Sequence, residues 1–134
     1  MIAEDLINPM IPALKVTDMA EKAIIWMEEL KIDQLPVIEH GTFKGLITEE
    51  MILESNNLNQ PIGEFLLHSE NCFVQDSQHY FDVLKVAIEK SAQIVAVLDE
   101  EGKYLGVTSY TDALHEFAKT FTIQSPGGII VLSV

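Results

Sequence analysis

The sequence predicts an α/β (α+β) fold built from two repeats related by a pseudo-twofold axis, each with a small three-stranded sheet packed with two helices. Three observations predict it. The two halves of the chain are copies of one pattern, apolar residues in one part of each copy recur with the helical period, and short β-rich apolar runs with turn residues between them follow. A second copy of the unit can cover the sheet face that the helices leave open.

The internal repeat sets each residue of the first half against the residue 60 positions later. The apolar positions of one predicted helix thereby align with those of another: Ala20, Ala23, Ile24 and Met27 with Tyr80, Val83, Leu84 and Ala87. One extra residue in the second turn, EEGK against HGT, raises the offset to 61, so that Thr48 aligns with Ser109. We therefore expect residues 1–60 to form the first repeat and residues 61–122 the second.

Each copy predicts the same order of elements: strand, helix, strand, hairpin, strand and helix. Thr17 or Asp18 in the first copy, and Ser77 in the second, are candidates for the N-cap of the first helix. HG and EEG are turn signals between the β-rich runs. The runs and closing helices are, in chain order, LPVIE, FKGLIT and TEEMILESN, and then IVAVLD, YLGVTS and SYTDALHEFAKTF.

Residues 123–134 belong to neither copy. Ser-Pro-Gly-Gly indicates a linker or turn, and IIVLSV indicates a β-strand. An unpartnered strand leaves its backbone hydrogen-bonding groups open to another strand. We expect this strand to be the first of a further C-terminal domain; the alternative is that it pairs with another chain.

Composition excludes several partners. The net charge is −13, from 21 acidic and 8 basic residues, which disfavours nucleic acid and anionic membrane surfaces. No apolar run approaches the roughly 20 residues that span a bilayer, and the N-terminal MIAEDLINPM is acidic where a signal peptide is basic. We expect a cytoplasmic protein, in which Cys72, the single cysteine, is buried.

The repeated motif is an apolar strand, a turn with Gly, and then Gly, two small or apolar residues and Thr/Ser-x-x-Asp; the second copy has the Asp and the first does not. Over residues 1 to about 122 the chain resembles a tandem pair of CBS domains, the cystathionine-β-synthase-type regulatory modules also called Bateman modules. SPGGIIVLSV is similar to the opening of the ACT domain that follows such a pair in proteins of the acetoin-utilisation type.

The resemblance implies a non-catalytic regulatory module. Such a module binds an adenosine-containing ligand (AMP, ADP, ATP or S-adenosylmethionine) in a cleft between its repeats, forms a homodimer and signals to an attached effector domain. The alternative is a ligand-free dimerisation scaffold with the same fold. The four histidines show no metal-ligand spacing, and neither a P-loop nor a G-x-G-x-x-G motif is present, so we expect no metal site, no firm cofactor and no enzyme.

One difference separates the two copies: Asp112 stands in GVTSYTDAL where Met51 stands in GLITEEMIL. The resemblance implies that this Asp accepts hydrogen bonds from the two ribose hydroxyls. Ser109, at the expected helix start, would add backbone N–H groups and a helix dipole that favour a phosphate. Ser-x-x-Asp is also a near match to a capping box, which needs no ligand. Because Met51 cannot accept such bonds, we expect at most one nucleoside site.

Five more residues complete the expected ligand site. The resemblance places Val107 beside Ser109 and Asp112, with Ile7, Pro12, Ala13 and Ile32 contributed by the first half. A purely structural role in the core is the alternative for each apolar residue.

Cations are scarce near the expected site. Lys15, Lys31 and His115 are the nearest by sequence. AMP or an adenosine thioether therefore fits better than ATP, unless Mg²⁺ contributes charge.

Overall fold

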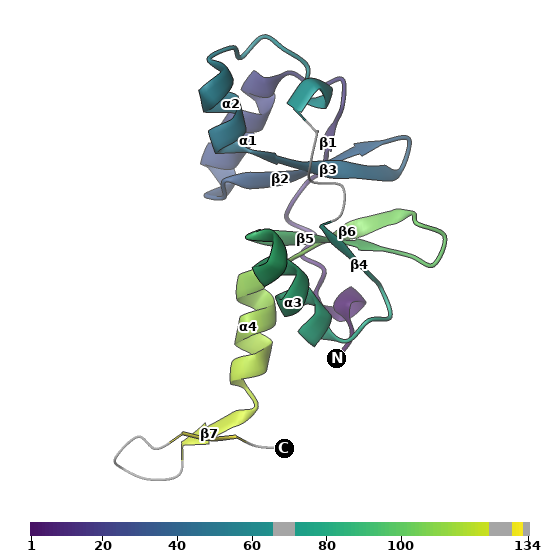
Figure 1. Cartoon of the computed structure of the whole chain (residues 1–134), viewed down its shortest axis with the longest axis vertical. Helices are drawn as coiled ribbons and strands as arrows, with labels where there is room; N and C mark the ends of the chain where they lie inside the picture. The colour runs from purple at the N-terminus through teal and green to yellow at the C-terminus, as the bar shows by residue number, and fades with distance from the viewer. Residues whose placement is uncertain (66–71, 124–129, 133–134) are drawn as a thin grey trace.

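Two similar α/β units lie one above the other along the long axis of the molecule (Figure 1). The computed structural model describes residues 1–65, 72–123 and 130–132. The first unit consists of β1 (Leu14–Lys15), α1 (Ala20–Leu30), β2 (Gln34–Glu39), β3 (Thr42–Thr48) and α2 (Glu49–Ser55). The second consists of β4 (Phe73–Gln75), α3 (Tyr80–Lys90), β5 (Ile94–Leu98), β6 (Tyr104–Ser109) and α4 (Tyr110–Ala118). The predicted fold class is confirmed.

Each unit holds one three-stranded sheet, in the order β1-β2-β3 or β4-β5-β6. The first pair of each sheet is parallel and the second antiparallel, because a helix crosses over between the parallel strands while a short turn joins the antiparallel ones. Figure 1 shows the two sheets facing each other in the middle of the molecule, with α1 and α2 beyond one sheet and α3 and α4 beyond the other.

The predicted repeat is reproduced in detail by the geometry. Helices α1 and α3 each have 11 residues and start 60 positions apart. Both end in a left-handed residue, Lys31 and Ser91. The irregularity in the antiparallel pairing falls after Val37 in one sheet and after Val97 in the other. The two units are therefore copies in backbone conformation as well as in sequence.

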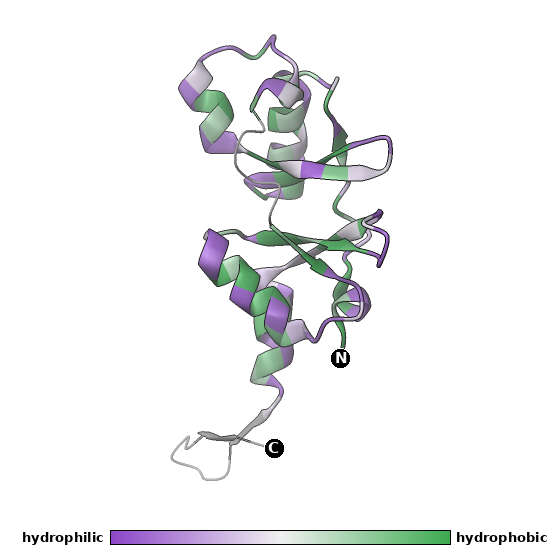
Figure 2. Ribbon diagram, turned by 45° about the vertical axis from the view of Figure 1, so that its right-hand side comes forward, coloured by the Kyte–Doolittle hydropathy of each residue, from purple (hydrophilic) through white to green (hydrophobic). Residues whose placement is uncertain are grey.

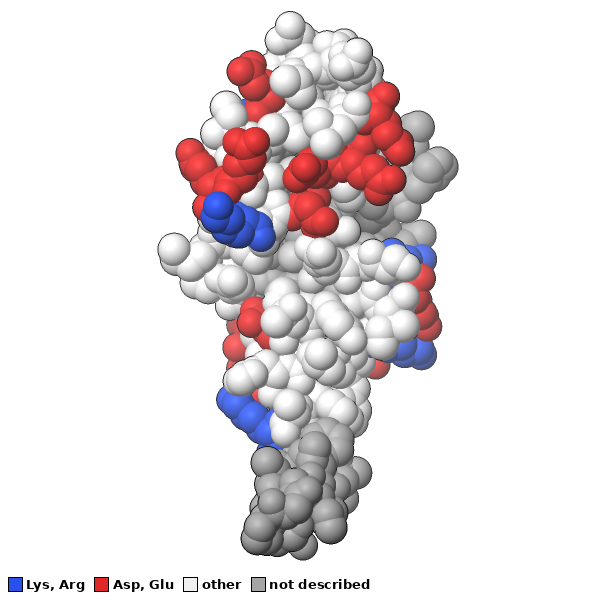
Figure 3. All heavy atoms as spheres, turned by 90° about the vertical axis from the view of Figure 1, so that its left-hand side faces the viewer, with Lys and Arg blue, Asp and Glu red and all other residues white. Residues whose placement is uncertain are grey.

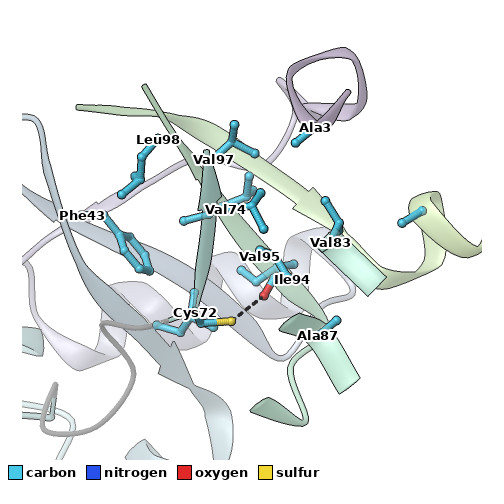
Figure 4. Packing of buried hydrophobic residues seen from close by; sticks show 14 of the residues in the cluster. Ala3, Phe43, Cys72, Val74, Val83, Ala87, Ile94, Val95, Val97 and Leu98 are labelled. Carbon is cyan, nitrogen blue, oxygen red and sulfur yellow. Dashed lines mark hydrogen bonds between the residues drawn. The ribbon is translucent and has the colours of Figure 1, made fainter. Parts of the chain in front are cut away.

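The core crosses from one unit into the other. Phe43 and Leu46 of β3 belong to the same buried cluster as the second unit's own core residues, and Figure 4 shows Phe43 facing Cys72, Val74 and Leu98 of the second unit. Strand β5 is buried along its whole length, because helices cover one of its faces and the opposite sheet covers the other.

The segment that opens each repeat packs on the other unit. The 3₁₀ helix η1 (Ala3–Leu6) lies on the second unit, where the Ala3 N–H donates to the Gln78 carbonyl at 2.8 Å. The 3₁₀ helix η2 (Ile62–Phe65) lies on the first, where the Ile62 N–H donates to the Asp18 carbonyl at 2.8 Å. This exchange of opening segments ties the two units together. The predicted repeat boundaries, at residues 60 and 122, stay predictions.

The N-caps expected for the first helix of each repeat were wrong. The N-cap residues are Met19 and His79, not Thr17, Asp18 or Ser77. Asp18 instead closes the preceding turn by accepting from the Lys15 N–H at 2.8 Å. Helix α1 does not need a side-chain cap, because carbonyls of the segment after α2 accept its first N–H groups: Ala20 donates to Gln60 and Glu21 to Leu58.

The C-terminal part also differs from expectation. The last helix ends at Ala118, three residues before the predicted end at Phe121. A short strand, β7 (Phe121–Ile123), follows and pairs antiparallel with β8 (Ile130–Leu132), which lies within IIVLSV. Aromatic and β-branched residues favour a strand here over a further helical turn. The Ser-Pro-Gly-Gly turn lies outside the described residues, and a following C-terminal domain stays a prediction.

Among the described residues, no helix is both long and apolar enough to cross a bilayer.

Thr108 on β6 carries a buried polar group without a partner. Its side chain is fully buried, and its hydroxyl forms no hydrogen bond within the described part of the chain. A buried hydroxyl left unpaired costs about 1–3 kcal/mol. We expect Thr108→Val to raise the free energy of unfolding, measured by urea denaturation, by about 1 kcal/mol. Thr42→Val, at an exposed strand position, is the control and should gain less; a destabilised Thr108→Val protein would contradict the assignment.

Cys72 and Tyr104 make stability depend on alkaline pH. Burial raises the pKa of the Cys72 thiol to about 11, against an opposing effect of the Lys90 charge, and raises the pKa of Tyr104 to about 12. The unfolded chain therefore releases these protons at lower pH than the folded chain does, so stability is complete below the ordinary thiol pKa and falls as pH rises toward 11.

The test compares urea denaturation of wild type and Cys72→Ala from neutral pH to pH above the ordinary thiol value. We expect the free energy of unfolding to fall less steeply with pH in the variant, because one of the two groups is gone. Equal slopes for the two proteins would contradict the role given to Cys72.

Candidate functional site

The start of α4 is held by its own cap. Ser109 is the N-cap residue, and its Oγ accepts from the Asp112 N–H at 2.9 Å. Thr48 does the same at the start of α2, accepting from the Met51 N–H at 3.1 Å. The predicted helix start at Ser109 is confirmed, and the cap is common to both units.

The Asp112 carboxylate takes no part in the capping hydrogen bond. Only the backbone N–H of Asp112 takes part in it, and the side chain neither accepts a hydrogen bond nor forms an ion pair within the described residues. Asp112 is exposed. The full reciprocal capping box is therefore absent, and a carboxylate at the helix start is left available to a ligand.

Asp112 borders a cleft of about 480 Å³ between the two units. This size is within the roughly 300–1,000 Å³ of small-molecule sites. The first unit and its opening segment contribute Asn8, Ile11, Lys31 and Ile32. The second unit contributes Ala92, Gln93, Ile94, Ser109, Tyr110, Thr111 and Asp112.

The structure brings three of the seven expected site residues to this cleft: Asp112, Ser109 and Ile32. Two other expected residues, Val107 and Ile7, are not among the residues that line the cleft. Val107 is fully buried, and its carbonyl accepts from the Asn8 N–H at 2.8 Å. Ile7 presses on β6 so closely that a Cβ added to Gly106 would lie 2.7 Å from its Cγ2 atom.

The remaining two expected residues, Pro12 and Ala13, are half-buried in the link to β1 and are not among the lining residues. Their expected contribution to the site stays a prediction.

Sequence reasoning missed several lining residues that the repeat could have supplied. Ala92 is the copy of Ile32 at the offset of 60. Tyr110 and Thr111 lie between two residues already singled out. Asn8 could not be found in this way, because it reaches the cleft only through the exchange of opening segments.

Gln34 joins the two units beside the cleft. Its side-chain Oε1 accepts from the backbone N–H of Gln93 at 2.8 Å and from that of Ile94 at 3.4 Å. These bonds run from the start of β2 to the start of β5, so they fix the separation of the two units at the point where Gln93 and Ile94 line the cleft.

Lys31 is the one Lys or Arg among the residues that line the cleft; Lys15 and His115 do not line it. Lys31 also borders a neighbouring hollow of about 560 Å³ that includes Glu28, Asp33 and Glu49. The site thus offers one cation and is flanked by acids, which suits a ligand with little negative charge. Among the described residues, no three His, Cys, Asp or Glu side chains gather to hold a metal ion.

The Met51 side differs in character. Met51 is half-buried against the first unit's core. The hollow beside it, of about 450 Å³, is lined by Leu53 and four acids: Asp33, Glu49, Glu50 and Glu54. The copies of Ile7 and Asn8 are residues 67 and 68, which lie outside the described residues.

The two caps give a matched pair of substitutions. We expect Ser109→Ala and Thr48→Ala each to lower the free energy of unfolding by about 1 kcal/mol, because each leaves a helix N–H without its acceptor. Urea denaturation measures both. If Ser109→Ala left the free energy of unfolding unchanged, the hydrogen bond from the Asp112 N–H to Ser109 would not contribute to stability.

We compared the chain with protein-family models and with solved structures. Residues 3–56 match the family model described as the CBS domain. A CBS domain pair/ACT domain protein from Thermotoga maritima superposes with a TM-score of 0.81 at 18% identity, over 89% of this chain and 98% of that one. CBSX2 in complex with AMP gives a TM-score of 0.73 at 19% identity, over 88% and 96%; CBSX2 is a CBS-pair protein from Arabidopsis thaliana.

A third solved structure is the cytosolic domain of the Mg²⁺ channel MgtE in complex with ATP, with a TM-score of 0.69 at 17% identity, over 83% of this chain and 46% of that one. At these identities the structures show the fold alone. The finer expectation of a CBS-ACT protein of the acetoin-utilisation type therefore stays a prediction. The first repeat thus matches the CBS domain model, and the two units together have the fold of a CBS domain pair.

Proposed function

We propose that this chain is a non-catalytic regulatory module that binds an adenosine-type ligand in the cleft bordered by Asp112 and signals to an attached domain. The observation that carries the proposal is the Asp112 carboxylate, which has no partner within the described residues, at the edge of a cleft that both units line. The AMP and ATP complexes of two proteins with the same fold support the choice of ligand class.

Asp112 suits a ribose. The two oxygens of one carboxylate can each accept a hydrogen bond from one of two adjacent hydroxyls, and a charged acceptor strengthens both bonds. Ile11, Ile32 and Ala92 supply apolar surface in the same cleft for a flat base. Because Asp112 already lies on a capped helix, its backbone does not have to be ordered when the ligand binds.

The phosphate environment favours few negative charges. The first N–H groups of α4 and the Lys31 ammonium group can hold one phosphate. The net charge of −13 and the acids beside Lys31 oppose further negative charge. AMP or S-adenosylmethionine therefore fits this cleft better than ATP.

Helix α4 gives a direct route for a signal. Its first turn borders the cleft, and two residues separate its last residue, Ala118, from β7 (Figure 1). A ligand that bridges Lys31 of the first unit and Asp112 of the second would also favour one relative placement of the two units. A domain attached after β7 would receive that change through α4.

Thermal denaturation in the presence of AMP, ADP, ATP and S-adenosylmethionine tests the proposal. A ligand at 100 times its dissociation constant stabilises the fold by roughly 2.7 kcal/mol, which raises the Tm of a chain of this size by several degrees. We expect the largest shift from AMP or S-adenosylmethionine, and none in Asp112→Ala. Glu50→Ala is the matched control, because it removes an exposed acid from the start of α2.

Two outcomes would count against the site. No shift with any of the four ligands at millimolar concentration would favour the ligand-free scaffold. A shift that survives in Asp112→Ala would place the ligand elsewhere. Thr48→Ala and Ser109→Ala add a second comparison, since both remove a cap but only Ser109 borders the cleft.

A second candidate function, the ligand-free dimerisation scaffold, is favoured by the apolar residues exposed on α3 and α4. It shares with the first candidate the homodimer that we propose for the chain. A monomer in light scattering at tens of micromolar would rule out the scaffold function and would not contradict the ligand site.

A further inference from the structure

A hollow of about 410 Å³, which we call the β1–β2 hollow, lies at the carboxyl ends of β1 and β2. The two strands are parallel, so both end at the same edge of the sheet, the edge at which open α/β sheets bind ligands. Residues 15–17 and residues 38–41 line the hollow. It shares no lining residue with the cleft bordered by Asp112.

Two half-buried side chains give the hollow an apolar surface. Lys15 and Ile38 are partners across β1 and β2, so their side chains point to the same face of the sheet. The preceding pair, Leu14 and Val37, is buried in the core of the first unit, which places Ile38 on the opposite face. Ile38 and Val16 are half-buried and can contact an apolar group of a ligand.

Lys15 supplies a positive charge that is not engaged elsewhere. Its side chain is exposed and forms no ion pair with any residue that the structure describes. Thr17 and His40 also line the hollow, and each can donate a hydrogen bond. Glu39, the one acid in the lining, lies 3.9 Å from the Lys44 ammonium group. The hollow therefore has one cation available to a ligand with one negative charge.

The hairpin turns of the two units differ at this edge. In the first unit, His40 and Gly41 both have positive φ, 51° and 77°, as a two-residue type I′ turn requires. In the second unit the turn is one residue longer, and the Asp99 carboxylate accepts from two N–H groups of the turn itself, at 2.9 and 2.8 Å. Asp99 is the copy of Glu39, which makes no such bond.

The basic side chains of the hollow are specific to the first unit. At the repeat offset of 60, Gln75 stands for Lys15 and Glu100 for His40. Lys15 and His40 are both exposed, and exchanges at exposed positions have little effect on stability. The difference between the copies therefore acts on what this edge of the sheet can bind.

We propose that the β1–β2 hollow binds a small organic monocarboxylate with a branched apolar body. The carboxylate accepts from the Lys15 ammonium group and from Thr17 and His40, while the apolar body contacts Val16 and Ile38. The volume lies within the roughly 300–1,000 Å³ of small-molecule sites. Inorganic phosphate fits less well, because it has no apolar body and its second charge would lie near the Glu39 carboxylate. The proposal does not depend on the adenosine-type ligand.

The rest of the first unit offers an anion little. Figure 3 shows acidic atoms gathered over the half of the helical side that holds α1 and α2, and both hairpins project away from the helices (Figure 1). Figure 2 shows hydrophilic residues at the turn of the β2–β3 hairpin. Because the net charge of −13 repels anions, a site for one needs local cations. Lys103, which pairs with Thr42 in an isolated β-bridge, adds a further one beside this hairpin.

Proton–nitrogen correlation NMR spectra of the full chain, titrated with isovalerate, test the proposal. We expect saturable shifts of the amide signals of residues 15–17 and 38–41, and none with isovaleramide, the neutral amide of the same shape. Lys15→Gln, which copies Gln75, should raise the dissociation constant about tenfold or more, because the charge that strengthens the hydrogen bond is lost. Lys85→Gln, which removes an exposed lysine of α3, is the matched control and should bind as wild type does.

His40→Asn gives a second test of the lining. Asn tolerates positive φ, so the turn is kept while the imidazole is removed, and we expect weaker binding of isovalerate. Circular dichroism checks that each variant is folded. Asp112→Ala should bind isovalerate as wild type does, which separates this site from the adenosine cleft.

Four outcomes would overturn the inference: no saturable shift with isovalerate at tens of millimolar, equal binding of isovaleramide, tighter binding of inorganic phosphate at the same residues, or shifts at Ser109 and Asp112 in place of the hollow. Unchanged affinity in both Lys15→Gln and His40→Asn would also overturn it. None of these results would alter a thermal shift with AMP or S-adenosylmethionine, so failure of this proposal is distinguishable from failure of the proposed function.

Discussion

The inner face of each three-stranded sheet can be buried only against the other sheet. Helices cover one face of a sheet, and the opposite face carries residues such as Phe43 and Leu46 that join the core of the neighbouring unit. The exchanged opening segments follow from the same constraint, since η1 on the second unit and η2 on the first close the two ends of this shared core. Neither unit has a complete core by itself. The cleft is a consequence as well, because it lies where the first unit, its opening segment and the start of α4 meet.

Within this symmetric frame the two copies have diverged at positions that do not carry the core. Core positions stay apolar in both copies, as at Ala23 and Val83. Positions nearer the surface differ instead: Glu28 stands opposite Ile88, and half-buried Met51 stands opposite exposed Asp112. A substitution on the outer surface changes what the unit can bind without a cavity or a buried charge in the core. The second unit thus carries a carboxylate at the cleft where the first carries a thioether.

Much of the fold could be predicted because each helix, strand and turn pattern occurs twice in the sequence, once in each copy. The strands of both hairpins and the cap at Ser109 followed from local pattern alone. The N-cap of α1 could not be predicted, because distant backbone satisfies its first N–H donors: Gln60 supplies a carbonyl. The N-cap of α3 was missed for another reason, since the imidazole of His79 accepts from the Phe81 N–H in place of a Ser or Thr hydroxyl. The end of α4 was placed too late, since sequence periodicity does not show where a strand partner such as β8 competes with a further helical turn.

The site was predictable to the extent that its residues obey the repeat. Ser109, Asp112 and Ile32 border the cleft; the first two were named from their places in a repeated motif and Ile32 from the family resemblance. Asn8 could not be found, because its position depends on which unit its segment packs on. Val107 was named from the family resemblance, which does not show whether its side chain or its backbone faces the cleft. Its side chain is buried, and its backbone carbonyl instead anchors the opening segment.

Helix α4 connects the cleft to the C-terminal strands. Its first turn carries Asp112 at the cleft, and two residues separate its last residue, Ala118, from β7. Because the cap at Ser109 already orders the first turn, the proposed ligand would act by favouring one relative placement of the two units and not by folding the helix. Thermodynamic reciprocity then requires that a contact at the far end of α4 that stabilises the same placement strengthens ligand binding by the factor by which the ligand strengthens that contact.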